Sequence, residues 1–169
     1  MIVVKSEETI PIQSLEIINM NSSLIQKHIM TVTPIKIIEI KEKEKIHLTK
    51  EEKLILATII RLECGGSSFE CQLAVGSVVL NRMAYFNQSL RDVIFAPNQF
   101  STARLINKKT GKSNYPPSAQ HIAAVEELVK NGSILPIHIM YFRARHFHSW
   151  TEPYRRIDST YFSYSKKYM

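Results

Sequence analysis

The sequence predicts an α+β domain that is mainly helical and carries a small antiparallel sheet near its C-terminus. Two observations predict this fold. Between Thr49 and Gly132, apolar residues recur with helical spacing, and capping residues stand at the ends of the apolar segments. After Gly132 the chain instead contains short segments that are dense in aromatic and β-branched residues. A length of 169 residues suits one such domain together with an extension.

Residues 1–48 differ in composition from the rest of the chain. They contain twelve isoleucines but no glycine and no aromatic residue. We therefore expect residues 1–48 to form an N-terminal extension or linker without catalytic content, ahead of a folded domain at 49–169. The segment from Met1 to Glu8 lacks the basic-then-apolar order of a secretory signal. No apolar run reaches the roughly 18 residues that would cross a membrane. No signal peptide or transmembrane segment is expected, and the export route stays open.

The net charge of +7 is carried entirely by the folded domain. Residues 1–48 contain six lysines and six glutamates, whereas residues 49–169 contain sixteen Lys and Arg against nine Asp and Glu. A basic domain favours an anionic partner, such as nucleic acid or an anionic glycan, although a charge of this size also serves solubility. No nucleic-acid-binding motif is present, so nucleic acid is not expected as a partner.

The first helix of the domain is predicted over residues 50–63. Thr49 and Glu52 have the spacing of a capping box at its start. Apolar residues cover most of its circumference, which is typical of a helix buried in a core. Glu63 lies on the last turn of this helix, separated only by Cys64 from a glycine pair that would end it.

A second helix is expected over about 68–85. Ser67 and Glu70 are interpreted as the capping box that opens it. Small residues along this helix would allow a neighbouring helix to approach closely. Gly76 costs about 1 kcal/mol of helix propensity relative to alanine, which indicates a packing reason for its presence.

The remaining elements follow from shorter signals, such as the capping spacing of Ser89 and Asp92. The elements expected in order are a short helix from Ser89 to Phe95, a loop at 98–102, a basic loop at 103–117, a helix over 118–130, and extended segments over 137–142 and 156–164 separated by a turned segment to Trp150.

Glu63 is the leading candidate for catalysis. The partial negative charge at a helix C-terminus and the apolar neighbours Leu62 and Phe69 would both raise the pKa of this carboxyl group. A carboxyl group with a raised pKa can act as a general acid near neutral pH. The alternative is a solvated surface glutamate, which is the commoner case for a glutamate near a helix end.

The two cysteines, Cys64 and Cys71, flank the glycine pair that follows Glu63. Three interpretations are open. They could form a disulfide outside the reducing cytosol, or remain as two buried thiols. They could also bind zinc together with His146 and His148, but six residues between two cysteines is not a typical zinc spacing. No metal ligand set is therefore expected.

The segment from Leu54 to Arg82 combines a helix ending in glutamate, a glycine-containing turn, a second glutamate with a glutamine, and a small-apolar helix. The residues concerned are Glu63, Gly66, Glu70 with Gln72, and Val79-Leu80-Asn81-Arg82. In this order they resemble the spore cortex-lytic (SleB/CwlJ-type) cell wall hydrolase family. The resemblance continues through Ser89–Ile94, Asn98–Ser101, Met140–Phe142 and Trp150. It spans nearly all of residues 49–169 and implies a lysozyme-like catalytic domain there.

The resemblance also implies roles for individual residues. Glu63 would be the catalytic acid, and Glu70 would support it or only cap its helix. The predicted substrate contacts are Gln99, Phe100, Ser101, Tyr141 and Trp150. For two of these an alternative is open, in which Phe100 anchors the core and Gln99 faces water.

The implied activity is that of a lytic transglycosylase acting on peptidoglycan. Such an enzyme cuts after N-acetylmuramic acid, or after its δ-lactam in spore cortex, with one glutamate serving first as acid and then as base. The alternatives are a true hydrolase, either glycosidase or amidase, and an inactive protein that binds the cell wall or spore coat. We expect a monomer without cofactor that acts at the cell wall or spore cortex, with a spore or wall-targeting protein as a candidate partner.

Overall fold

The computed structural model describes residues 46–169, which lie within one compact unit, Lys43–Met169. The N-terminal extension expected over residues 1–48 falls almost entirely outside the described residues. In the described part of the chain, no helix is both long enough and apolar enough to span a membrane.

Helix α2 (Lys50–Cys64) begins where the sequence predicts. The Thr49 side chain accepts a hydrogen bond from the Glu52 amide at 3.2 Å, and the Glu52 carboxylate accepts one from the Thr49 amide at 2.9 Å. This reciprocal pair is the predicted capping box. It satisfies two amides that the first turn of a helix leaves without an intrahelical partner.

Helix α3 (Phe69–Phe86) begins one residue later than the predicted capping box requires. Its cap is Ser68, whose hydroxyl accepts from the Cys71 amide at 3.3 Å, so the predicted box of Ser67 with Glu70 is wrong. The amide of Ser68 in turn donates to the Asp158 carboxylate at 2.8 Å. Because Asp158 lies ninety positions along the chain, the contact that holds this cap is tertiary, and local spacing does not contain it.

The shorter helices agree closely with the predictions. Helix α4 (Leu90–Ile94) has the capping box of Ser89 with Asp92, and the 3₁₀ helix η3 (Ser101–Leu105) lies in the loop that follows it. Helix α5 (Ala119–Asn131) starts after Ser118. It ends at Gly132, whose φ of 76° is the left-handed conformation that favours glycine.

The sheet has three antiparallel strands in the order β1-β3-β2: β1 (Tyr141–Ala144), β2 (Glu152–Ile157) and β3 (Thr160–Tyr164). The predicted single extended segment over 156–164 is therefore wrong, because Asp158 takes a left-handed φ of 51° and turns the chain between β2 and β3. The segment predicted over 137–142 forms a strand only from Tyr141 onward.

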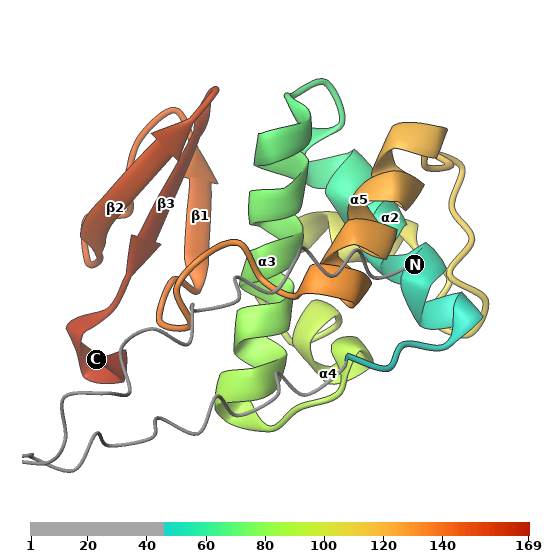
Figure 1. The fold of residues 1–169 in the computed structure, drawn as a ribbon, viewed down its shortest axis with the longest axis horizontal. Helices are drawn as coiled ribbons and strands as arrows, with labels where there is room; N and C mark the ends of the chain where they lie inside the picture. The colour runs from blue at the N-terminus through green and yellow to red at the C-terminus, as the bar shows by residue number, and fades with distance from the viewer. Residues whose placement is uncertain (1–45) are drawn as a thin grey trace, which may run out of the picture. The chain divides into compact units, whose positions relative to one another are not determined.

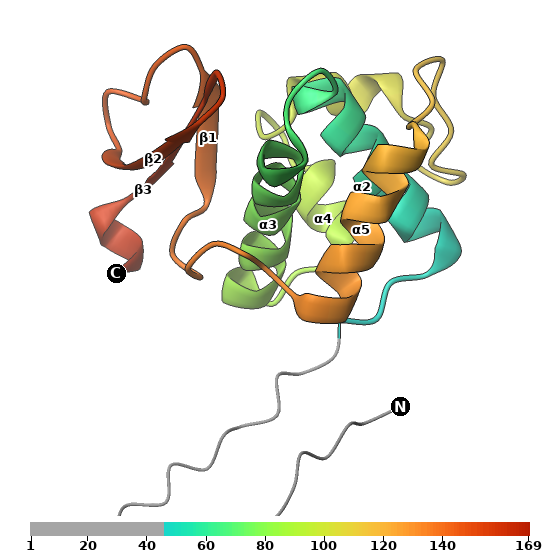
Figure 2. The same ribbon diagram turned by 45° about the horizontal axis from the view of Figure 1, so that its top comes forward.

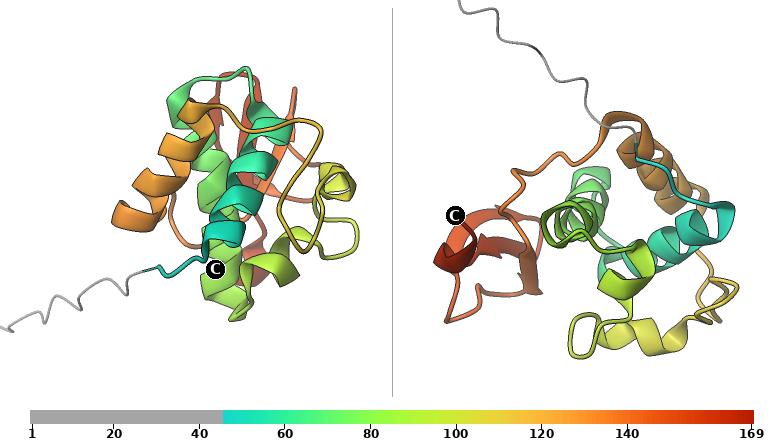
Figure 3. Two further views of the ribbon diagram at one scale, coloured as in Figure 1. Left: turned by 90° about the vertical axis from the view of Figure 1, so that its right-hand side faces the viewer. Right: turned by 90° about the horizontal axis from the view of Figure 1, so that it is seen from below.

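Helix α3 stands between the sheet and the pair α2 and α5 (Figures 1, 2 and 3). Its position depends on Gly76, because a Cβ atom there would lie 2.4 Å from Leu128 of α5 and 3.1 Å from Ile60 of α2. The packing reason expected for this glycine is thus confirmed. The largest fully buried side chains come from both sides of α3, and include Ile55, Leu56, Ile59, Ile60, Leu128, Ile139, Met140 and Phe162.

Candidate active site

Glu63 lies on the last turn of α2 and is half-buried. Its Oε1 atom accepts a hydrogen bond from the hydroxyl of Thr102, which belongs to η3. Burial raises the pKa of the Glu63 carboxyl above its ordinary value, and the bond from Thr102 offsets part of this effect by stabilising the charged form. The raised pKa agrees with the expectation from the sequence, and burial is its main cause.

The loop before η3 is held in place by Phe100. This ring is only 7% exposed and packs against Phe142 of β1, with 6.1 Å between the ring centroids. Because so little of the ring is accessible, Phe100 has no free face to offer a sugar. Its position favours the alternative role of core anchor, which fixes Thr102 beside Glu63.

Two predicted substrate contacts, Tyr141 and Trp150, lie side by side at the sheet. Their rings meet edge to face with 4.9 Å between centroids, and Trp150 is 60% exposed. His148 lies next to Trp150, with 5.2 Å between ring centroids. An exposed indole held by two neighbouring rings offers a rigid apolar face of the kind that stacks on a sugar.

Arg82, at the far end of α3, connects the loop with the sheet. Its guanidinium group lies over the rings of Phe100 and Tyr141, 5.5 and 5.4 Å from their centroids. It donates hydrogen bonds to the carbonyl oxygen of Met140 at 2.8 Å and to the side-chain oxygen of Gln99. The structure therefore brings Gln99 and Tyr141 together, whereas the exposed Ser101 has no side-chain hydrogen bond among the described residues.

Two residues of this region, Thr102 and Arg82, were not among the predicted site residues. Thr102 follows the predicted loop contacts directly, but nothing in its spacing from Glu63 indicates a hydrogen bond across thirty-nine positions. Arg82 belongs to the Val-Leu-Asn-Arg segment that carries the family resemblance, and its aromatic neighbours come from distant parts of the chain.

Three other acidic side chains, Glu70, Asp92 and Asp158, already have partners of their own. Glu70 is exposed and forms an ion pair with Arg155 at 2.7 Å. Asp92 caps α4, and Asp158 accepts the Ser68 amide, which lowers the pKa of the Asp158 carboxyl. The pKa of the Glu63 carboxyl is therefore shifted in the opposite direction to that of Asp158.

Cys64 and Cys71 are buried free thiols, so the structure favours the second of the three interpretations. The Cys71 thiol donates to the Thr160 hydroxyl at 3.4 Å. The hydrogen bond from Cys64 is the main cause that lowers the pKa of Cys71 to about 6, and the same bond raises the pKa of Cys64. Across residues 46–169 no group of three or more His, Cys, Asp or Glu side chains is arranged to hold a metal ion.

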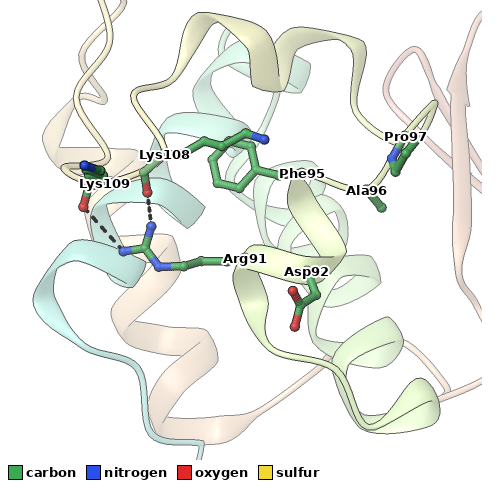
Figure 4. Close-up of a pocket in the computed structure, with 7 residues that line it drawn as sticks. All are labelled: Arg91, Asp92, Phe95, Ala96, Pro97, Lys108 and Lys109. Carbon is green, nitrogen blue, oxygen red and sulfur yellow. Dashed lines mark hydrogen bonds between the residues drawn. The ribbon is translucent and has the colours of Figure 1, made fainter.

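A hollow with a volume of about 710 Å³ lies between α4 and the predicted basic loop, and Glu63 is not among the residues that line it (Figure 4). Arg91 donates to the carbonyl oxygens of Lys108 and Lys109, and the Lys108 ammonium lies 5.2 Å from the centroid of the Phe95 ring. These contacts tie the loop to α4. A catalytic role follows from chemistry rather than from volume, so the candidate site is centred on Glu63 and not on this hollow.

Comparison with known proteins identifies a family model described as Cell Wall Hydrolase, which matches residues 66–163 and so begins just after Glu63. No curated protein matches the sequence. Among solved structures, the catalytic domain of the Bacillus cereus SleB protein is 17% identical with a TM-score of 0.56, covering 73% of this chain and 98% of that one. The catalytic domain of the germination-specific lytic transglycosylase SleB from Bacillus anthracis is 19% identical with a TM-score of 0.57, covering 69% and 96%. These likenesses confirm the predicted fold class.

Proposed function

This chain belongs to the cell wall hydrolase family, and we propose that it cleaves the glycan strands of peptidoglycan as a lytic transglycosylase, with Glu63 as the reacting group. The observation that carries the proposal is the half-buried Glu63 carboxyl, whose pKa is raised by burial and whose Oε1 atom is held by Thr102. A carboxyl group in this state can hold a proton near neutral pH and deliver it in a fixed direction.

In the first step, protonated Glu63 donates its proton to the glycosidic oxygen that follows the muramic acid ring. The bond between this oxygen and the anomeric carbon breaks, and positive charge develops on the ring. The Glu63 carboxylate that remains is stabilised by the hydrogen bond from Thr102 and lies close to the new positive charge.

In the second step, the same carboxylate accepts the proton of the C6 hydroxyl of the muramic acid ring. The C6 oxygen then bonds to the anomeric carbon of its own ring, which closes a 1,6-anhydro sugar. Glu63 is protonated again, and no water is consumed. One carboxyl group therefore performs both proton transfers.

The engagement of the other acids supports this mechanism over that of a two-carboxylate glycosidase. A glycosidase that retains or inverts configuration requires a second carboxylate near the anomeric carbon. Glu70 is paired with Arg155, and Asp158 is bonded to the amide of Ser68. For the same reason we assign Glu70 to the surface of α3 and to its ion pair rather than to proton transfer.

We further propose that the substrate is contacted by Gln99, Ser101, Tyr141 and Trp150, and that the protein acts as a monomer at the cell wall or spore cortex. The description of the Bacillus anthracis relative as germination-specific supports the cortex as the site of action. A spore or wall-targeting protein stays a candidate partner.

The test is digestion of purified spore cortex and vegetative peptidoglycan, followed by mass spectrometry of the released fragments. We expect anhydro-muramic ends, which are lighter than hydrolytic ends by one water. Glu63→Gln should reduce the rate by about 10²–10⁴-fold, the usual contribution of a general acid. Glu70→Gln is the matched control and should retain most of the activity.

The other products would each overturn part of the proposal. Hydrated reducing ends would identify a glycosidase, and free stem peptides would identify an amidase. Full activity in Glu63→Gln would remove Glu63 from the mechanism. The absence of any product from the wild-type protein would favour a protein that binds the wall without cleaving it.

A further inference from the structure

The guanidinium group of Arg82 has hydrogen-bond donors that are not used within the described part of the chain. A guanidinium group carries five N–H donors. Two of them are used by the Met140 carbonyl oxygen and by the side-chain oxygen of Gln99. Among residues 46–169, Arg82 forms no further hydrogen bond, so three donors remain.

Its positive charge also has no counter-ion in the described part of the chain. None of the ion pairs formed by residues 46–169 includes Arg82. The titratable groups that act on it are the phenols of Tyr141 and Tyr168, and burial lowers its pKa below the ordinary value. A desolvated charge is costly unless an opposite charge or hydrogen bonds compensate it. An incoming anion would therefore recover part of this cost.

Arg82 opens onto a hollow of about 240 Å³ that has room for such an anion. The hollow is lined by Gln99, Tyr141, Tyr168, Phe86 and Val93 among others, and no acidic side chain lines it. Burial, together with the neighbouring hydroxyl of Tyr168, raises the pKa of Tyr141 to about 12. At neutral pH the phenol of Tyr141 is therefore uncharged, and its hydroxyl can donate a hydrogen bond.

The hollow adjoins the catalytic acid through one short loop. Gln99 accepts from Arg82, and Thr102, three residues later, donates to Glu63. Three consecutive residue steps span at most about 11 Å between Cα atoms. A ligand lying along this loop can therefore contact both Glu63 and the Arg82 hollow.

We propose that the Arg82 hollow binds a carboxylate group carried by the muramic acid of the substrate. The inference rests on the proposed function for the identity of the glycan. The choice of a carboxylate as ligand rests on three observations: Arg82 has three free donors, its charge has no counter-ion among the described residues, and no acidic side chain lines the hollow. The planar fork of a guanidinium group matches two carboxylate oxygens at once. The lactyl group of muramic acid supplies such a carboxylate only where no peptide is attached. Where a peptide is attached, the lactyl carboxyl is an amide and the carboxylate belongs to the peptide, and the δ-lactam of spore cortex offers neither.

The experiment measures binding rather than cleavage, so that its failure is distinct from failure of the proposed activity. The full chain with Glu63→Gln is titrated with two matched pairs of soluble probes. The first pair is an N-acetylglucosaminyl-N-acetylmuramic acid disaccharide with its lactyl group as free acid or as amide. The second is the same disaccharide carrying a stem peptide whose carboxylates are free or amidated. Affinities are measured by calorimetry or NMR titration.

We expect the free acid to bind about tenfold more tightly than the amide in at least one pair, the scale of one charge-assisted hydrogen bond. The pair that shows the difference identifies the source of the carboxylate. Arg82→Gln in the same chain should abolish the preference, and Arg82→Lys should keep part of it, since lysine retains the charge but not the fork.

Comparing acid with amide on the unchanged Arg82 protein requires no substitution in the hollow, so it stays informative even if an Arg82 variant fails to fold. Equal affinities in both pairs would overturn the proposal, as would the absence of measurable binding by any acid. A preference that persists in folded Arg82→Gln would also overturn it, because the carboxylate would then bind elsewhere.

Discussion

Replacement of Gly76 by alanine tests how the helices that position Glu63 are packed. The new Cβ would lie 2.4 Å from Cδ1 of Leu128 and 3.1 Å from Cδ1 of Ile60, and both side chains are completely buried. Ordinary carbon–carbon contacts are about 3.5–4.0 Å, so at least Leu128 has to move within a filled core.

The expected magnitude is the difference of two terms. Overpacking a buried site costs about 1–3 kcal/mol, and the shortness of the contact to Leu128 places this change in the upper part of that range. Alanine regains about 1 kcal/mol of helix propensity over glycine. The free energy of unfolding of Gly76→Ala should therefore fall by about 1–2 kcal/mol. Because Ile60 lies one turn before Glu63, activity should fall as well.

The assay is urea unfolding followed by circular dichroism, with Gly66→Ala as control. A Cβ at Gly66 would have no atom within 4 Å, so this variant should stay within about 0.5 kcal/mol of the wild type. Adding Leu128→Ala removes the closer of the two clashes and leaves the 3.1 Å contact with Ile60. In that background Gly76→Ala should cost less free energy of unfolding than it does alone, because the gain in helix propensity is then opposed only by the looser contact. A Gly76→Ala protein as stable as the wild type would refute the close packing of α3 against α5.

Three further outcomes are expected. Thr102→Val removes the hydrogen bond that favours ionised Glu63, so the alkaline limb of the pH–rate profile should move to higher pH. Thr102→Ser keeps a hydroxyl group and should leave the limb in place. An unmoved limb in the valine variant would contradict the assigned hydrogen bond. Because burial raises the folded-state pKa of Glu63, ionisation of this carboxyl destabilises the folded protein as the pH rises through that pKa. Glu63→Gln should therefore increase the free energy of unfolding at pH 8, with no gain below about pH 4. Urea titrations that show the same gain at both pH values would rule this out. Cys64 and Cys71 should both react with a thiol reagent when the protein is unfolded without a reducing agent. A lack of reaction at both cysteines would indicate a disulfide between them.

The helix starts that depend on local hydrogen bonds were predictable from the sequence. The boxes of Thr49 with Glu52 and Ser89 with Asp92 each join residues three positions apart, so spacing alone contains the contact. The start of α3 was not predictable in this way, because the amide of its capping Ser68 is bonded to Asp158 at the turn between β2 and β3. The turn at Asp158 also divides the segment 156–164, which the sequence predicts as one strand.

In the candidate site as well, the residues marked by local patterns could be predicted from the sequence, and those placed by tertiary contacts could not. Glu63 was a candidate from the sequence, because a glutamate near a glycine pair at the end of an apolar helix is a local pattern that the family resemblance also includes. Its partner Thr102 and the guanidinium group of Arg82 reach their places through tertiary contacts. For Phe100 the sequence left two roles open, a sugar contact implied by the family resemblance and a core anchor. Its burial, which depends on tertiary packing, favours the core anchor.

The loop from Gln99 to Thr102 explains how one short segment can serve both binding and catalysis. Its residues have different partners: Gln99 bonds to Arg82 of α3, Phe100 packs on β1, and Thr102 bonds to Glu63 of α2. The segment therefore ties the sheet, the central helix and the catalytic helix to one another. If the hollow binds the substrate as proposed, a sugar that orders Gln99 would also restrict Thr102 through the buried Phe100 ring between them. Binding there would then help to orient the Glu63 carboxyl, as proximity and orientation effects in catalysis require.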